Sequence, residues 1–264
     1  MTTTVNRRSP GNHRPPATFA DLPGLMSLMT GDDKHDQAAT STLDVLWVLY
    51  DRVLRVTPQT AGDDARDRFV LSKGHGPMAY YAVLAAQGFL DPADLPGFGA
   101  FGSILGLHPD RVLVPGVEIS SGSLGHGLPL AVGIALGLRA RGQRERHLAD
   151  ARVFVLVGDA ELDEGSNHEA IAFARAARLD TLHVVVVDNA SSTYGWPGGV
   201  EARFAVEGWS VRRVSGRDHD ALEAAFTVAH PGRPHMVAAV VEPKSAAAGP
   251  PAAWAPAGPA APAR

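Results

Sequence analysis

Short apolar runs alternate with longer helix-like segments along most of the chain. The apolar runs cover residues 69–71, 153–157, 184–187, 211–214 and 236–241, and helix-like patterns cover residues 41–55, 77–87, 122–141 and 218–228, with an alanine-rich pattern after residue 159. Continuous apolar runs are typical of strands that are buried on both faces. The alternation predicts an α/β fold: a doubly wound, mainly parallel sheet with helices on both faces.

The remaining segments predict one domain with two irregular ends. Residues 91–119 are rich in Gly and Pro, and a loop of that length in a compact domain is usually functional. Residues 21–244 show no break in composition and are expected to form the domain. We expect residues 1–20 to form a disordered arm and the Ala/Pro-rich residues 245–264 to form a flexible tail.

Composition excludes several classes of function. The chain has 264 residues with 24 Lys+Arg against 28 Asp+Glu, a balance that does not suggest nucleic-acid binding. Cysteine is absent, so neither a disulfide framework nor a thiol nucleophile is expected. No apolar run approaches the roughly 20 residues of a membrane span, and the N-terminus does not resemble a secretory signal. The expected location is cytoplasmic.

An acid and an amide follow two consecutive apolar runs. Asp159 comes after the run 153–157, and Asn189 comes after the run 184–187. Ligands of parallel sheets bind beyond the carboxyl ends of the strands, so both side chains are expected in one crevice. Both are hard oxygen ligands that suit Mg²⁺, although Asp and Asn are also common turn residues. The pair predicts a divalent cation that holds the phosphates of a cofactor.

Three sequence words extend this interpretation to a family. GDAELDEGSNHEA, LSKGHGPMAYYAVL and LHPDRVLVPGVEISSGSLGHGLPLAVG, which begin at residues 158, 71 and 107, resemble the N-terminal half of transketolase. The resemblance spans about residues 25–242 and implies a thiamine-diphosphate-binding domain. It implies that Asp159, Asn189 and the backbone carbonyl of Ser191 bind Mg²⁺, or Ca²⁺ or Mn²⁺ in its place. The chain departs from the family at Ala160, where Gly is usual; a methyl group is tolerable there if φ is negative.

The resemblance also implies roles for three histidines. His35 and His108 are expected to be catalytic, and His108 would hold the substrate hydroxyls. His75 would contact the cofactor diphosphate. A further family histidine has no counterpart in the segment that follows the last apolar run, which begins at Pro243.

The other implied cofactor contacts come mainly from backbone and small residues. They are Gly122, Ser123 and Leu124 of a glycine-rich turn, Gly158 and Ala160 beside the diphosphate, and Glu164, which would point toward a second polypeptide. Glu161 and Asp163 are interpreted as surface charges.

The family's activity is transfer of a two-carbon ketol unit from a ketose donor to an aldehyde acceptor. Its catalytic Glu lies in a pyrimidine-binding domain that does not occur in this chain. We therefore expect a partner subunit that resembles the C-terminal half of transketolase, in a heterotetramer of two chains of each kind. The segments 124–138 and 164–168 are expected to face that partner. Three alternatives are another thiamine enzyme, a carbon–carbon bond-forming enzyme of secondary metabolism and a non-catalytic binding subunit.

Overall fold

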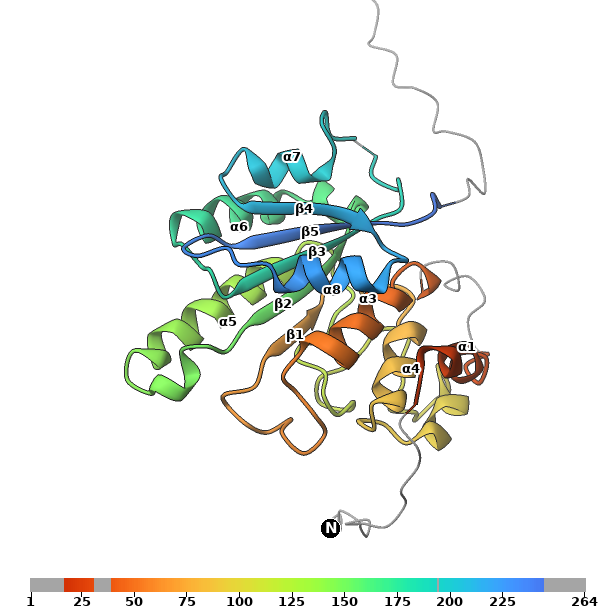
Figure 1. Ribbon diagram of the computed structural model, residues 1–264. Coiled ribbons are helices and arrows are strands. Elements are labelled where there is room, and N and C mark those ends of the chain that lie inside the picture. The colour runs from red at the N-terminus through yellow and green to blue at the C-terminus, as the bar shows by residue number, and fades with distance from the viewer. Residues whose placement is uncertain (1–16, 31–38, 194, 245–264) are drawn as a thin grey trace, which may run out of the picture.

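A five-stranded parallel sheet forms the centre of the computed structural model, which describes residues 17–30, 39–193 and 195–244 (Figure 1). The strands are β1 (Arg68–Leu71), β2 (Val153–Gly158), β3 (Leu182–Asp188), β4 (Ser210–Ser215) and β5 (His235–Val240). Their order is β1-β2-β3-β5-β4, and every neighbouring pair is parallel. The short strand β1 and strand β4 therefore form the two edges of the sheet.

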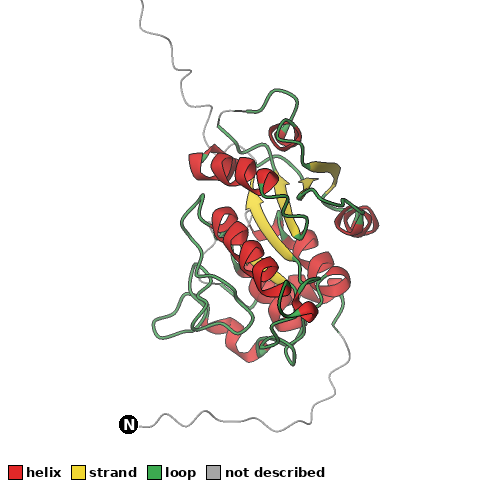
Figure 2. Ribbon diagram, turned by 90° about the vertical axis from the view of Figure 1, so that its left-hand side faces the viewer, coloured by secondary structure: helices red, strands yellow, loops and turns green. Residues whose placement is uncertain are grey.

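Helices cover both faces of this sheet, as Figure 2 shows. One face packs against α3 (Leu43–Val48), α4 (Met78–Ala86) and α8 (His219–Thr227), and α1 (Leu22–Met26) packs on α4. The other face packs against α5 (Gly127–Gly142), α6 (Gly165–Ala176) and α7 (Val200–Ala205). The predicted doubly wound α/β fold is confirmed.

The apolar runs are continuous because each central strand is buried on both faces. In β2, Phe154 and Leu156 pack with the helices of one face, whereas Val153, Val155 and Val157 pack with those of the other. All five side chains are fully buried. Successive side chains of a strand point to opposite faces, so a sheet covered on both sides needs apolar residues at every position.

Three helical segments differ from the sequence prediction. The helix expected over residues 41–55 is an α-helix only to Val48 and continues as the π-helical turn η3 (Leu49–Val53). This turn places the Tyr50 hydroxyl 3.0 Å from that of Tyr80. Helices α1 and α7 were not predicted. The helix predicted to begin at Asp218 is confirmed as α8, where the Asp218 side chain accepts a hydrogen bond from the Ala221 amide.

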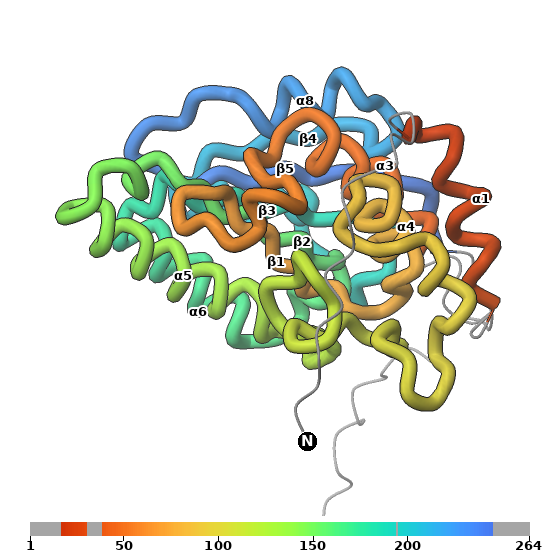
Figure 3. Tube along the Cα trace, turned by 90° about the horizontal axis from the view of Figure 1, so that it is seen from below, coloured from red at the N-terminus to blue at the C-terminus, as the bar shows by residue number. Residues whose placement is uncertain are grey.

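Short helical turns complete the described chain. They are η1 (Phe19–Asp21), η4 (Pro92–Gly97), η5 (Arg146–Leu148) and η6 (Ala160–Asp163). The loop predicted over residues 91–119 contains only η4 and lies beside α4 and the glycine-rich turn before α5 (Figure 3). Within the predicted arm, Phe19 packs edge-on against the rings of Trp47 and His219. Residues 1–16 and the predicted tail lie outside the described residues.

None of the helices in the described ranges is both long enough and apolar enough to cross a lipid bilayer.

Candidate functional site

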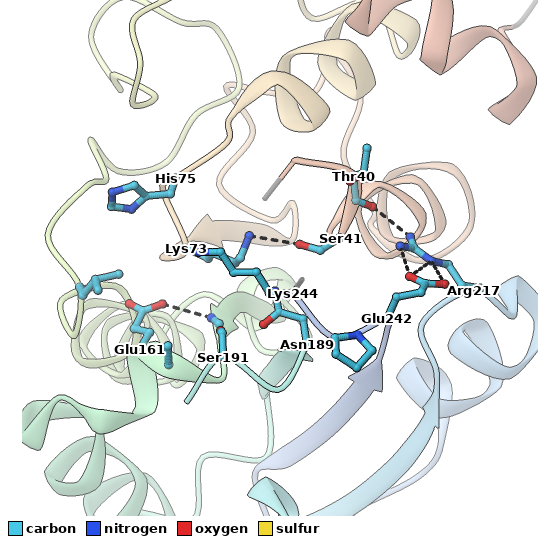
Figure 4. A pocket seen from close by; sticks show the side chains of 14 residues that line it. Thr40, Ser41, Lys73, His75, Glu161, Asn189, Ser191, Arg217, Glu242 and Lys244 are labelled. Atoms are coloured by element: carbon cyan, nitrogen blue, oxygen red, sulfur yellow. Dashed lines mark hydrogen bonds and ion pairs between the residues drawn. The ribbon is translucent and has the colours of Figure 1, made fainter. Parts of the chain in front are cut away.

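A cavity of about 430 Å³ lies beyond the carboxyl ends of the strands. It is lined by Thr40, Ser41, Lys73, His75, Leu124, Gly158, Ala160, Glu161, Asn189, Ser191, Arg217, Glu242, Pro243 and Lys244. These residues come from the carboxyl end of β2, from the segments after the five strands, from the segment before α3 and from the turn before α5 (Figure 4). The cavity is at the edge of the sheet where parallel folds bind ligands.

The carboxylate of Asp159 connects the ends of β2 and β3. The side chain is only 1% exposed, and its Oδ1 accepts hydrogen bonds from the Ala160 amide at 2.8 Å and the Ser191 hydroxyl at 2.6 Å. Its Oδ2 accepts from the backbone amides of Ser191 at 2.6 Å and Ser192 at 3.3 Å. The structure therefore brings together Asp159 and Ser191, two of the three residues predicted to hold the metal.

Asn189, the third of these residues, has an unsatisfied polar atom. Its side chain is 7% exposed, and its Oδ1 has no hydrogen-bond partner in the described part of the chain. Leaving a buried acceptor unpaired costs about 1–3 kcal/mol. A bound ligand or cation would remove this cost. Since Gly158 and Val187 are paired across β2 and β3, Asp159 and Asn189 leave the sheet side by side. An oxygen-donating pair with one unsatisfied atom fits a hard cation such as Mg²⁺.

The same site contains few protein ligands. Among residues 17–30, 39–193 and 195–244, no group of three or more His, Cys, Asp or Glu side chains is arranged to hold a metal ion. A cation at Asp159 and Asn189 would therefore need main-chain, water or ligand oxygens to complete an octahedral shell. This requirement fits a metal bound together with phosphate groups.

The backbone conformation of Ala160 decides whether an alanine is tolerated where the family usually has glycine. Its φ is not positive, since Arg178 and Ala190 are the non-glycine residues with positive φ in the described chain. The alanine methyl group is thus compatible with the backbone at this position. Ala190, between Asn189 and Ser191, has φ of 55°. A left-handed conformation costs an L-residue roughly 1–2 kcal/mol, and such strain often occurs at functional sites.

Two lysines give the cavity a cationic side. Burial lowers the pKa of Lys73 to about 8, while the nearby carboxylates of Asp159 and Glu161 act in the opposite direction. Lys244 also lines the cavity, and its backbone amide donates to the Asn189 carbonyl at 2.8 Å. Neither residue was predicted from the sequence, although Lys73 lies inside the segment LSKGHGPMAYYAVL. Two ammonium groups beside a cation site suit a polyanionic ligand.

The position of Glu161 corrects the sequence interpretation, which placed this residue on the surface. Its side chain is 2% exposed and lines the cavity. Its Oε1 accepts from the Ser72 hydroxyl and from the Gly125 amide at 3.0 Å, and its Oε2 accepts from the Gly158 amide at 3.3 Å. Burial raises the pKa of this carboxyl group, and these hydrogen bonds oppose the shift. Glu161 thereby fastens the glycine-rich turn to the ends of β1 and β2.

Asp163 is likewise not a free surface charge. Its two oxygens accept from the Ser192 hydroxyl at 2.9 Å and the Thr193 amide at 3.0 Å. Together with Asp159, it holds the loop after β3 against the turn after β2.

The predicted histidines are placed in different ways. His75 lines the cavity, and its ring lies edge-on to that of His108 at a centroid distance of 5.1 Å. His108 does not line the cavity; its Nε2 is buried without a partner in the described residues. His35 lies outside the described residues. The loop that carries His108 therefore meets the turn that carries His75.

The glycine-rich turn packs closely against these residues. Gly122 has φ of 131°, and a Cβ there would be 3.0 Å from the His108 ring. Leu124 is 38% exposed and lines the cavity, whereas Ser123 is exposed and does not line it. Glu164 is also exposed, at the start of α6. Ser123 and Glu164 are thus placed near the cavity rather than in it.

Comparison with known proteins identifies relatives of this arrangement. The family described as transketolase, thiamine diphosphate binding domain, matches residues 27–245. The chain is 55% identical over 229 residues to the protein named Ferredoxin fas2 of Rhodococcoides fascians, covering 87% of this chain and 74% of that protein. It is 33% identical over 211 residues to 6-deoxy-6-sulfo-D-fructose transketolase subunit SqwG of Clostridium sp. strain MSTE9, covering 77% of this chain and 74% of that protein.

A solved structure shows the same fold. Transketolase from Leishmania mexicana superposes with a TM-score of 0.70 at 26% identity, over 85% of this chain and 36% of that chain. The chain therefore spans little more than a third of that longer transketolase.

Proposed function

Because the chain belongs to the transketolase family through its thiamine-diphosphate-binding domain, we propose that it is the cofactor-binding subunit of a two-chain, Mg²⁺-dependent ketol-transferring enzyme. The observation that carries this proposal is the unsatisfied Oδ1 of Asn189 beside Asp159, in a cavity that two lysines also line. This arrangement fits a divalent cation that holds the diphosphate of thiamine diphosphate.

Several groups in and beside the cavity have roles in this proposal. Asp159, Asn189 and the Ser191 carbonyl bind the metal, and Lys73 and Lys244 offset the remaining phosphate charge. The backbone of Gly158 and Ala160 lies beside the diphosphate, and Gly122, Ser123 and Leu124 lie toward the rings of the cofactor. Bound thiamine diphosphate supplies the carbanion chemistry that breaks and forms the carbon–carbon bond.

The histidines serve the substrate and the diphosphate. We assign His75 to the diphosphate, and His108 to the hydroxyl groups of a ketose donor, with His35 as a second catalytic histidine. The buried, unpartnered Nε2 of His108 supports a role in accepting a hydrogen bond from a ligand or donating one to it.

We also propose that activity requires a second polypeptide. The Clostridium relative is named as a subunit of a transketolase, and the Leishmania mexicana transketolase chain is far longer than this one. The partner would supply the pyrimidine-binding domain and its catalytic Glu, with Glu164 pointing toward it, in a heterotetramer of two chains of each kind.

The surface of α5 and α6 supports this assembly. Leu130 and Phe173 are 49% and 52% exposed, and a Cβ at Gly133 or Gly137 would meet nothing within 4 Å. A face with exposed apolar side chains and open glycines permits close packing against another chain.

The test combines cofactor binding with activity. In the assembled enzyme, Asp159→Ala is expected to abolish Mg²⁺-dependent binding of thiamine diphosphate in calorimetric titration, and Asn189→Ala is expected to weaken it. The complex of both chains is expected to transfer a ketol unit, whereas this chain alone is expected to be inactive. Unchanged cofactor affinity in Asp159→Ala, or full activity of the isolated chain, would contradict the proposal.

The ferredoxin function in the name of the Rhodococcoides fascians relative is not extended to this chain. Iron–sulfur clusters are held by Cys thiolates, and this sequence contains no cysteine. A specialised acceptor other than a sugar is the second candidate, because the segment after β5 has no histidine between Pro243 and the end of the sequence. Comparing sugar and non-sugar aldehydes as acceptors in the ketol-transfer assay distinguishes the two.

A further inference from the structure

Arg217 connects three segments at one wall of the cavity. It follows β4, and its Nη1 donates to the Thr40 carbonyl oxygen at 3.0 Å and to Asp44 Oδ2 at 2.5 Å. Its Nη2 donates to Glu242 Oε2 at 2.6 Å. Figure 4 shows the guanidinium between Thr40 and Glu242, on the side of the cavity away from His75 and Glu161.

One partner of Arg217, the Asp44 carboxylate, is itself held in place. Asp44 is 7% exposed, and its second oxygen, Oδ1, lies 2.9 Å from His219 Nε2. Hydrogen bonds to Glu242 and Asp44 raise the pKa of Arg217, and the bond to Arg217 lowers the pKa of Glu242. Both Arg217 and Glu242 are thus charged at neutral pH. A planar guanidinium that binds two carboxylates has little freedom of orientation.

Arg217 connects the segment before α3 with the segment after β5, and these two segments depend on Arg217 to different degrees. Backbone hydrogen bonds hold the segment after β5 independently, from the Val241 amide to Asp188 and from the Lys244 amide to Asn189. Thr40 and Ser41, which also line the cavity, precede α3 and belong to no strand of the sheet. Removing Arg217 would therefore separate the Thr40–Ser41 segment from β4 and Glu242, whereas backbone hydrogen bonds would still hold the segment after β5.

We propose that Arg217 is a positioning residue that fixes the Thr40–Ser41 wall and thereby sets the fit of the substrate in the cavity. This inference rests on the proposed ketol-transferring function. The residues assigned to the metal follow β2 and β3, and the hydrogen bonds of Arg217 within the described chain go to other residues, so cofactor binding should be largely independent of it. Misplacing a wall that orients the substrate can cost as much as about 100-fold in rate.

The test uses the assembled enzyme with three variants. Arg217→Ala removes the connection, and Arg217→Lys keeps the charge without the planar fork. Arg52→Ala is the matched control, since Arg52 joins η3 to α8 through Asp220 at 2.9 Å and Glu223 at 3.1 Å and does not line the cavity. The measurements are KM and kcat for a ketose donor, calorimetric affinity for thiamine diphosphate with Mg²⁺, and hydrogen exchange of the Thr42 and Leu46 amides.

Arg217→Ala is expected to raise KM by about 10-fold or more, with a smaller change in kcat and nearly unchanged cofactor affinity. Its Thr42 and Leu46 amides should exchange faster, Arg217→Lys should recover part of KM, and Arg52→Ala should match the wild type. The inference is overturned if Arg217→Ala matches Arg52→Ala, or if cofactor affinity falls as much as KM rises. Absence of ketol transfer in the wild-type complex would refute the proposed function, and hydrogen exchange alone would then decide whether Arg217 positions the wall.

Discussion

Acidification is expected to destabilise the chain through two buried histidines at the amino-terminal end of the sheet. His183 lies near the start of β3 and His235 starts β5; their rings lie 6.0 Å apart, and both contact His230. Burial lowers the pKa of His235 to about 4 and places that of His183 well below its usual value. The His235 imidazole is therefore neutral in the folded chain at pH 5.

The magnitude follows from the difference in bound protons. An unfolded histidine has a pKa of about 6.5, so between about pH 6.5 and 4 the unfolded chain binds up to one more proton at His235 than the folded chain does. The neutral His235 side chain makes its full contribution to folding stability above about pH 6.5. Below that pH the contribution falls by up to about 1.4 kcal/mol per pH unit. From pH 7 to pH 5 the loss is about 2 kcal/mol for His235, and His183 acts in the same direction.

Urea unfolding of the wild type and of His235→Gln at pH 7 and pH 5 measures this effect. Other titrating groups contribute to both proteins, so the difference between the two pH dependences isolates His235. The variant is expected to be less stable at pH 7, because the His235 ring nitrogens lie 3.1 Å from Ser210 Oγ and 3.0 Å from the Ala225 carbonyl. It should nevertheless lose less stability on acidification. Equal losses in both proteins would refute the reasoning.

Three further predictions concern the packing around the site and the sheet. Asp67→Asn should destabilise the chain by about 3 kcal/mol or more, measured by urea unfolding, because the buried Asp67 carboxylate pairs with Arg55 and Arg152; an unchanged midpoint would contradict this. Ala190→Gly should relieve a left-handed backbone and stabilise the chain by up to about 1 kcal/mol, detected as a raised thermal midpoint, whereas a lowered midpoint would argue against strain. Gly127→Ala should prevent stable folding, because the new Cβ would lie 2.2 Å from Ser72 Cβ; circular dichroism showing native thermal unfolding would exclude that clash.

The sheet was predictable because its signals are local. Each central strand needs apolar side chains on both faces, so the runs that contain Val155 and Val185 stand out in the sequence. The strand-end position of Asp159 and Asn189 follows directly from those runs and from parallel topology. Helix α7 was missed because its pattern is short, with only six residues.

The rest of the cavity depends on contacts that leave no local pattern. Glu161 resembles an exposed acid at the start of a helix, yet its partners Ser72 and Gly125 lie 89 and 36 residues away in sequence. Arg217 and Asp44 are separated by 173 residues. Such charged side chains meet only because the topology brings distant loops to one edge of the sheet. Their position is a property of the fold as a whole rather than of any one segment.

The position of β4 at the edge of the sheet has a consequence for how the chain behaves in concentrated solution. Within the described residues its outer edge has no strand beside it, and an unpaired edge can recruit another chain and start aggregation. The strand reads Ser-Val-Arg-Arg-Val-Ser, and Arg212 and Arg213 are both exposed. A second copy approaching edge to edge would bring these like charges together. The two arginines thus help to keep the sheet from growing beyond its own chain.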